Sequence, residues 1–98
     1  MLMVMRLVVI YRVRSDRARA VSEFIETLNR RYPGKTLHEL DIDTREGAAE
    51  AALYGVMDYP AFIATAYDGR VVSMWQGMPL PLIDEVAAML LDQQTVTV

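Results

Sequence analysis

An uninterrupted run of five apolar residues, from Leu7 to Tyr11, limits the fold of this chain more than any other part of its sequence. Most of these side chains are β-branched or aromatic, which favours an extended strand. A run without polar alternation is typical of a strand that is buried on both faces. We therefore expect residues 7–11 to lie in the middle of a sheet.

A helix and a second strand are expected after this run. Ser15 or Asp16 can cap a helix that ends at Pro33-Gly34. Its apolar residues recur at helical spacing, and they are Val21, Phe24, Ile25, Leu28 and Tyr32. Residues 36–43 alternate apolar with polar side chains over most of their length, which indicates a strand with one half-buried face.

The next segment, residues 45–54, is rich in alanine and predicts a second helix. Thr44 stands directly before it and is a suitable N-terminal cap. Gly55 follows it at the position where a helix commonly ends in a left-handed residue. The sequence therefore gives this helix a start signal and a stop signal.

A hairpin and a last helix complete the pattern. Residues 61–67 and 70–76 are two β-rich runs around Asp68-Gly69, which predicts a hairpin with a two-residue turn. Residues 82–90 show amphipathic helical spacing, and the polar tail 92–98 is expected to be frayed.

The element order is thus βαβαββα, within a single domain over residues 1–98 and with a core over about residues 6–91. Two strands separated by a helix are most simply joined by a right-handed crossover and lie parallel, whereas the hairpin adds antiparallel strands. The fold class is therefore α/β, with a mixed four-stranded sheet covered by helices on both faces.

Composition excludes several classes of function. The 98 residues include no cysteine, so the chain has no disulfide, no thiolate metal site and no thiol nucleophile. A net charge of −3 and a pI near 5.0 argue against broad nucleic-acid binding. Arg6 interrupts the apolar start, which is too short to span a bilayer, so we expect a cytoplasmic protein without membrane contact.

Local sequence then resembles a known family. Leu40–Asp43 is similar to the strand ending in Asn-Ile-Asp of the thioredoxin family, and Tyr54–Pro60 is similar to its Tyr-Gly-Ile/Val-x-x-x-Pro segment. Asp68-Gly69 in the hairpin and Gly77 before the last helix stand at nearly unchanged spacings. The resemblance covers residues 7–91 and implies a thioredoxin-like fold, with a cis peptide bond before the proline of the second segment.

The chain departs from the family where the family performs its chemistry. The resemblance places the Cys-x-x-Cys motif at four residues that contain no sulfur, namely Ser15, Asp16, Arg17 and Ala18. The family's buried aspartate corresponds to Val9, and its nearby lysine corresponds to Glu39. Tyr59 puts a bulky ring before Pro60, beside the family's peptide groove. Dithiol–disulfide exchange requires a thiolate, so this chain cannot perform it.

Two groups of residues are candidates for binding. Four arginines near the start of the first helix, where the helix dipole favours anions, form a candidate anion contact: Arg12, Arg14, Arg17 and Arg19. The alternative is a solvated cluster balanced by Asp16 and Glu23. A candidate groove consists of Met57, Tyr59, Pro60 and Trp75. Exposed methionine and aromatic side chains there would mark a protein contact, whereas buried ones would only pack.

Catalytic and metal chemistry find little support. Ser15 needs a base to act as a nucleophile, and the only histidine, His38, is expected on a different strand. We therefore interpret Ser15 as a helix cap and His38 as an exposed or half-buried strand residue. One histidine and scattered carboxylates give no metal-ligand spacing, so we expect no metal and no cofactor.

The leading hypothesis is a redox-inert, thioredoxin-like protein-binding module that is not an enzyme, works as a monomer or homodimer, and binds an unidentified protein. The alternative is a cysteine-free enzyme of the thioredoxin superfamily that binds an anion such as glutathione near the first helix. A third hypothesis, a regulatory protein like the clock protein KaiB, is disfavoured by the hairpin followed by an amphipathic helix. Fold analogy alone does not separate these functions.

Overall fold

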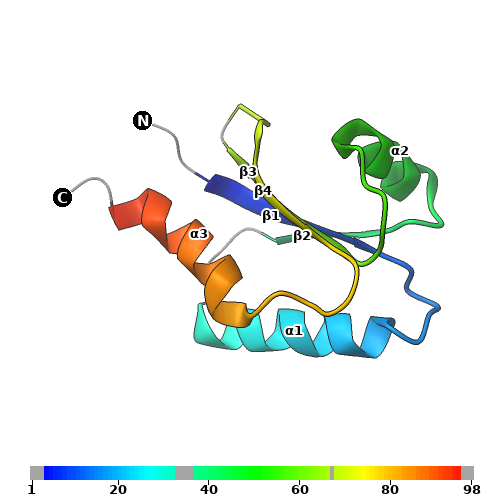
Figure 1. Ribbon diagram of the computed structural model, residues 1–98, viewed down its shortest axis with the longest axis horizontal. Helices are drawn as coiled ribbons and strands as arrows, with labels where there is room; N and C mark the ends of the chain where they lie inside the picture. The colour runs from blue at the N-terminus through cyan, green and yellow to red at the C-terminus, as the bar shows by residue number, and fades with distance from the viewer. Residues whose placement is uncertain (1–3, 33–36, 67, 96–98) are drawn as a thin grey trace.

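The computed structural model describes residues 4–32, 37–66 and 68–95. Its elements follow the expected order βαβαββα (Figure 1). They are β1 (Val4–Tyr11), α1 (Ala18–Arg31), β2 (Leu37–Asp41), α2 (Arg45–Tyr54), β3 (Ala61–Ala66), β4 (Val71–Gln76) and α3 (Ile83–Thr95).

The strands form one mixed sheet in the order β2-β1-β3-β4. β1 runs parallel to β2, with Leu7 opposite Leu37, and antiparallel to β3, with Val8 opposite Ile63. β3 and β4 are antiparallel. The interior position predicted for residues 7–11 is confirmed, because β1 has a strand on each side.

Helices cover both faces of this sheet, as the sequence predicted. α1 and α3 lie on one face and α2 lies on the other (Figure 1). Successive side chains of β1 point to opposite faces. Leu7 and Val9 accordingly pack with α1 and α3, while Val8 and Ile10 pack with Ala51 of α2.

The helical phase predicted for α1 is confirmed, but its predicted start is wrong. The side chains at 21, 24, 25 and 28 are all buried. The residue at the N-cap is Arg17, whose side chain makes no capping hydrogen bond. Ser15 instead donates its hydroxyl to the Arg12 carbonyl at 2.6 Å. This local turn uses the Ser15 side chain, which explains why it does not cap the helix. The predicted stop, Pro33-Gly34, lies outside the described residues.

Both signals predicted for α2 are confirmed. The hydroxyl of Thr44 accepts a hydrogen bond from the Gly47 N–H at 3.0 Å, and Gly55 ends the helix with a φ of 69°. Gly47 also packs against the backbone of Asp41, where a Cβ atom would overlap the carbonyl oxygen. The first turn of α2 therefore lies directly on the end of β2.

The hairpin connection is longer than the predicted two-residue turn. The Ala66 N–H donates to the Arg70 carbonyl at 2.8 Å, so the connection exceeds the two residues Asp68-Gly69. A register shift opposite Ala64 and Thr65 makes Val72 an extra residue in β4. Val72 therefore packs on the same side of the sheet as Trp75, three residues away.

α3 extends further than predicted. It begins one residue after Leu82, whose N–H donates to the Glu85 carboxylate at 3.1 Å. Its buried residues include Val86 and Ala87, which face β1 and α1. The helix continues to Thr95, so most of the tail that was expected to be frayed is helical here.

The packing of α1 predicts a large effect of one substitution. The Phe24 ring lies 4.7 Å from the Phe62 ring, centroid to centroid, at a tilt of 56°. Phe24→Ala leaves a cavity between α1 and β3, and we expect it to lower the free energy of unfolding by about 3–5 kcal/mol. Urea denaturation measures this loss. The matched control is Leu53→Ala at an exposed position, for which we expect a change within about 0.5 kcal/mol. A loss below about 1 kcal/mol for Phe24→Ala would contradict this packing.

Candidate functional site

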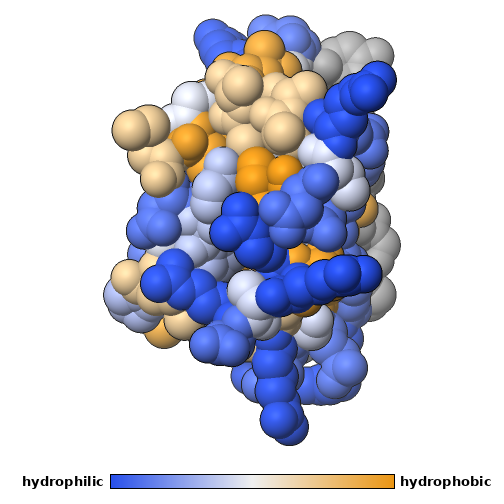
Figure 2. Space-filling model, turned by 90° about the vertical axis from the view of Figure 1, so that its right-hand side faces the viewer, coloured by the Kyte–Doolittle hydropathy of each residue, from blue (hydrophilic) through white to orange (hydrophobic). Residues whose placement is uncertain are grey.

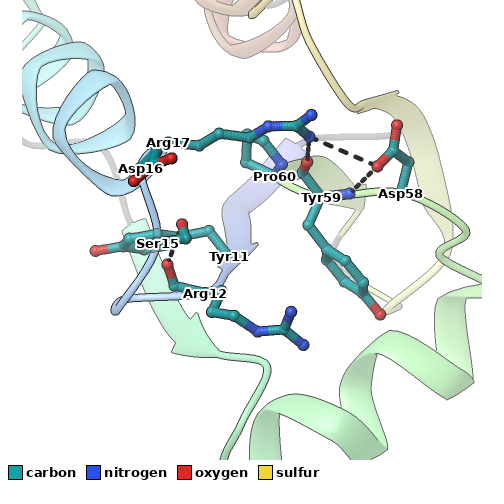
Figure 3. Close-up of a pocket in the computed structure, with 8 residues that line it drawn as sticks. All are labelled: Tyr11, Arg12, Ser15, Asp16, Arg17, Asp58, Tyr59 and Pro60. Carbon is teal, nitrogen blue, oxygen red and sulfur yellow. Dashed lines mark hydrogen bonds and ion pairs between the residues drawn. The ribbon is translucent and has the colours of Figure 1, made fainter.

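A cleft of about 310 Å³ opens between two connections of the fold. One wall is the segment between β1 and α1, and the other is the segment before β3 (Figure 3). The residues that line it are Tyr11, Arg12, Ser15, Asp16, Arg17, Asp58, Tyr59 and Pro60. Most of them are polar, and four carry a charge.

The position of the degenerate Cys-x-x-Cys motif lies at this cleft. Ser15, Asp16 and Arg17 line it, whereas Ala18 is the first residue of α1 and packs against the core. The Ser15 hydroxyl donates its hydrogen bond to the backbone of its own loop. His38 is half-buried on β2 and does not line the cleft. No other lining side chain forms a hydrogen bond with the Ser15 hydroxyl.

The opposite wall consists of Asp58, Tyr59 and Pro60, which follow Met57, and the Tyr59–Pro60 peptide bond is cis. Gln76, at the end of β4, accepts hydrogen bonds at its amide oxygen from the N–H groups of Met57 and Asp58, at 2.6 and 3.3 Å. The Tyr59 N–H donates to the Asp58 carboxylate at 2.8 Å. The segment is therefore held by side chains at three successive N–H groups.

Gly77 packs against this wall and limits which residue can stand at its own position. Its N–H donates to the Pro60 carbonyl at 2.8 Å, and its φ is 74°. A Cβ atom at Gly77 would overlap the carboxylate of Asp58. The left-handed backbone favours a glycine here, and a larger residue would also have to displace the Asp58 side chain.

Arg17 crosses the cleft and joins its two walls. One of its terminal nitrogens donates to the Tyr59 carbonyl at 2.5 Å and lies 3.8 Å from the Asp58 carboxylate (Figure 3). The side chains of Arg17 and Asp58 are 50% and 63% exposed. An ion pair this exposed contributes only about 0–1 kcal/mol to stability. The ion pair with Asp58 thus adds little to the hydrogen bond that Arg17 donates to the Tyr59 carbonyl.

The structure does not bring the four predicted arginines together. Only Arg12 and Arg17 line the cleft, and the Nε atom of Arg12 lies 3.2 Å from the carboxylate of Asp43. Arg19 points away along α1, where it pairs with Glu23 at 3.5 Å. Arg14 is exposed in the loop and does not line the cleft. Both cleft arginines therefore already have a carboxylate of the chain as a neighbour.

The predicted groove is divided in a similar way. Tyr59 and Pro60 line the cleft, while the Tyr59 ring also packs against the core on the α2 face. Met57 precedes the lining residues, and its side chain is 86% exposed. Trp75 is half-buried against the core on the α1 and α3 face and does not line the cleft.

Comparison with known proteins gives structural relatives only. No family model matches the chain, and no curated protein matches it. Similar solved structures include thioredoxin from Schistosoma mansoni, with 20% identity, a TM-score of 0.70 and coverage of 93% of this chain and 80% of that chain. Mitochondrial thioredoxin 3 from Saccharomyces cerevisiae has 17% identity, a TM-score of 0.67 and coverage of 88% and 76%. A mutant thioredoxin from Halobacterium salinarum has 24% identity, a TM-score of 0.70 and coverage of 89% and 72%.

The chain has a thioredoxin-like fold. The resemblance seen in the sequence is thereby confirmed at the level of the fold. The sequence contains no cysteine, so this thioredoxin-like chain lacks the dithiol motif. The cleft of Ser15 and Pro60 occupies the position that the resemblance assigned to that motif.

Tyr11 is a buried titratable group that sequence reasoning did not connect with the thioredoxin-like cleft. It is the last residue of β1, and its hydroxyl donates to the Glu39 carboxylate at 3.3 Å. Burial, and then the negative charge of Glu39, raise the pKa of Tyr11. Val9, where the family has its aspartate, is fully buried and offers no carboxylate. The position of Tyr11 at the end of the predicted buried strand was the one signal in the sequence that could have placed it at the cleft.

Asp58 and Gln76 were also missed by the sequence analysis. Asp58 lies inside the segment that resembles the family, but no pattern connects it with Arg17, which is 41 residues earlier in the chain.

Among the described residues, no group of three or more histidine, aspartate or glutamate side chains is arranged to hold a metal ion. None of the helices in the described ranges is long and apolar enough to cross a membrane.

The environment of Tyr11 predicts a pH effect. Its pKa lies above the ordinary value of 10.0, so the phenol remains neutral in the folded chain at pH values where it ionises in the unfolded chain. The neutral Tyr11 phenol makes its full contribution to the free energy of unfolding below the pKa that it has in the unfolded chain. This contribution is lost as pH rises through the higher pKa of the folded chain. Tyrosine ¹³C NMR titration measures this pKa. We expect Glu39→Gln to lower it by removing the nearby charge, while burial still holds it above 10.0. An unchanged pKa in the variant would contradict the contribution of Glu39.

Proposed function

We propose that this chain is a redox-inert, thioredoxin-like protein-binding module whose protein partner docks at the rim of the cleft beside Pro60. The observation that carries the proposal is the exposure of Met57, whose large apolar side chain is 86% exposed directly before the segment that lines the cleft. The cytoplasmic location expected from the sequence is part of this proposal.

Met57 combines exposure with a fixed position. Its backbone N–H donates to Gln76, so the side chain projects from a segment that is already held. Methionine adapts its shape to irregular apolar surfaces, which makes it common at binding sites. Leu53, near the end of α2, is 73% exposed. Figure 2 shows apolar side chains gathered over α2 at the top of this end of the molecule, above a mostly hydrophilic middle. Such exposed apolar side chains support a docking surface.

The side-chain chemistry of the cleft supports binding rather than catalysis. The chain has no thiol, and the Ser15 hydroxyl donates to its own loop. Nucleophilic catalysis by serine needs a base that is hydrogen-bonded to the hydroxyl, and no other lining side chain makes this bond to Ser15. A thioredoxin-like fold without this chemistry still offers a preformed surface with a cleft.

The alternative, a cysteine-free enzyme that binds an anion such as glutathione, receives less support. A bound anion would have to separate Arg12 from Asp43 and Arg17 from Asp58. A thermal-shift titration with glutathione separates the two functions. The proposal predicts no saturable change in melting temperature, whereas a saturable rise that disappears in Arg17→Ala would favour the enzyme.

Capture of the partner tests the proposal directly. Wild-type protein, Met57→Glu and Leu82→Glu are immobilised and exposed to an extract of the source cell, and retained proteins are identified by mass spectrometry. Leu82 is 69% exposed and does not line the cleft, so Leu82→Glu is the matched control. Binding of the purified partner is then measured by calorimetry.

We expect wild-type protein and Leu82→Glu to bind the partner equally. Met57→Glu should bind it at least about tenfold more weakly, because truncating or charging a central interface residue typically costs about 2 kcal/mol or more. A partner that binds all three proteins with the same affinity would contradict docking at Met57.

A further inference from the structure

We propose that the Tyr59 carbonyl and the Asp58 carboxylate form a guanidinium-binding site, which the chain's own Arg17 occupies until an arginine of the partner replaces it. The claim about the partner depends on the proposed function. The claim about the site depends only on the geometry of the cleft and can be tested without a partner.

The contacts of Arg17 define the chemistry of the site. Its guanidinium faces two acceptors, a backbone carbonyl at 2.5 Å and a carboxylate oxygen at 3.8 Å (Figure 3). The same terminal nitrogen makes both contacts, and its two N–H groups can face two neighbouring acceptors. A lysine ammonium is more strongly hydrated than a guanidinium, so we expect it to leave water for this exposed pair of acceptors less readily.

The two acceptors are held by contacts that do not involve Arg17. The Asp58 carboxylate accepts from the Tyr59 N–H at 2.8 Å and lies against Gly77, where a side chain would displace it. The N–H of Asp58 donates to Gln76. The site should therefore keep its shape when the Arg17 side chain is removed.

The charges that remain after removal of Arg17 favour a cation. The lining residues then carry the two carboxylates of Asp16 and Asp58 and one guanidinium, that of Arg12. Arg12 itself lies 3.2 Å from Asp43, which also carries a negative charge. An empty site would therefore be net negative, which attracts an arginine and repels an anion.

Arg17 is bound loosely enough to be exchanged. Its side chain is half exposed, and although it stands at the N-cap of α1 it makes no side-chain capping hydrogen bond. Release of the side chain therefore removes no cap from the helix. A tethered group competes at an effective concentration on the order of millimolar, so a free arginine must exceed that level to displace it. An arginine on a partner that also contacts Met57 can displace Arg17 at a lower concentration than free arginine, because the second contact holds the partner at the cleft.

The test uses Arg17→Ala and the small probe N-acetylarginine amide. The probe is titrated into ¹⁵N-labelled protein, and chemical shifts are followed at the amides of Asp58 and Tyr59. In Arg17→Ala we expect saturable shifts at these two amides in the range of about 1–50 mM, and in wild-type protein a lower affinity for the probe, because Arg17 competes. Absence of saturable shifts in Arg17→Ala would overturn the site.

Three controls make the result specific. Arg19→Ala removes the same charge from the same helix but does not touch the cleft, so it should respond like wild-type protein. Adding Asp58→Asn to Arg17→Ala keeps an acceptor for the Tyr59 N–H but removes the charge, and should weaken probe binding several-fold. N-acetyllysine amide should bind Arg17→Ala more weakly than the arginine probe. Equal binding of the two probes would overturn a guanidinium site.

These outcomes are independent of the partner experiment. If the probe binds Arg17→Ala and the partner binds Met57→Glu as tightly as wild-type protein, the site is retained and the proposed docking surface is rejected. A partner that depends on Met57, together with an Arg17→Ala protein that binds no probe, would retain the function and reject the site. Amide spectra of each variant show whether it is folded.

Discussion

The amide oxygen of Gln76 accepts hydrogen bonds from the N–H groups of Met57 and Asp58, and this tie between β4 and the segment before Pro60 supports the whole cleft. A short loop offers few backbone acceptors to its own N–H groups, which then bond to side chains or to water. Here one side chain from a neighbouring strand supplies two of the bonds. The Asp58 carboxylate and the Tyr59 carbonyl are thereby presented to the cleft at fixed positions.

The thioredoxin-like fold explains why a cleft exists at this place, and the side chains explain what the cleft can do. The end of β1 lies beside the start of β3, and this brings the segment before α1 next to Pro60. In this chain the junction carries Ser15 and Arg17 where the resemblance places cysteines and their neighbours, and both side chains make polar contacts within the chain. The fold therefore does not determine the chemistry of the cleft, because function resides in the site and not in the fold.

Much of the fold could be predicted from the sequence, because its signals are local. The apolar run of β1, the helical spacing of α1 and the caps of α2 each depend on neighbouring residues. The candidate site could be predicted only in part. Arg12 and Arg17 lie in the cleft, but their sequence neighbours Arg14 and Arg19 do not, since the loop and the first turn of α1 direct side chains differently. The contact of Arg17 with Tyr59 joins residues 42 positions apart, and no local pattern encodes it.

Amide hydrogen exchange at Met57, Asp58 and Tyr59 tests the central claim, that side chains of this chain satisfy the backbone before Pro60. We expect slowed exchange at all three amides in wild-type protein, although Met57 is 86% exposed. In Gln76→Ala, protection should be lost at Met57 and Asp58, because their acceptor is removed. Exchange in wild-type protein at the rate of an unstructured chain would contradict the account.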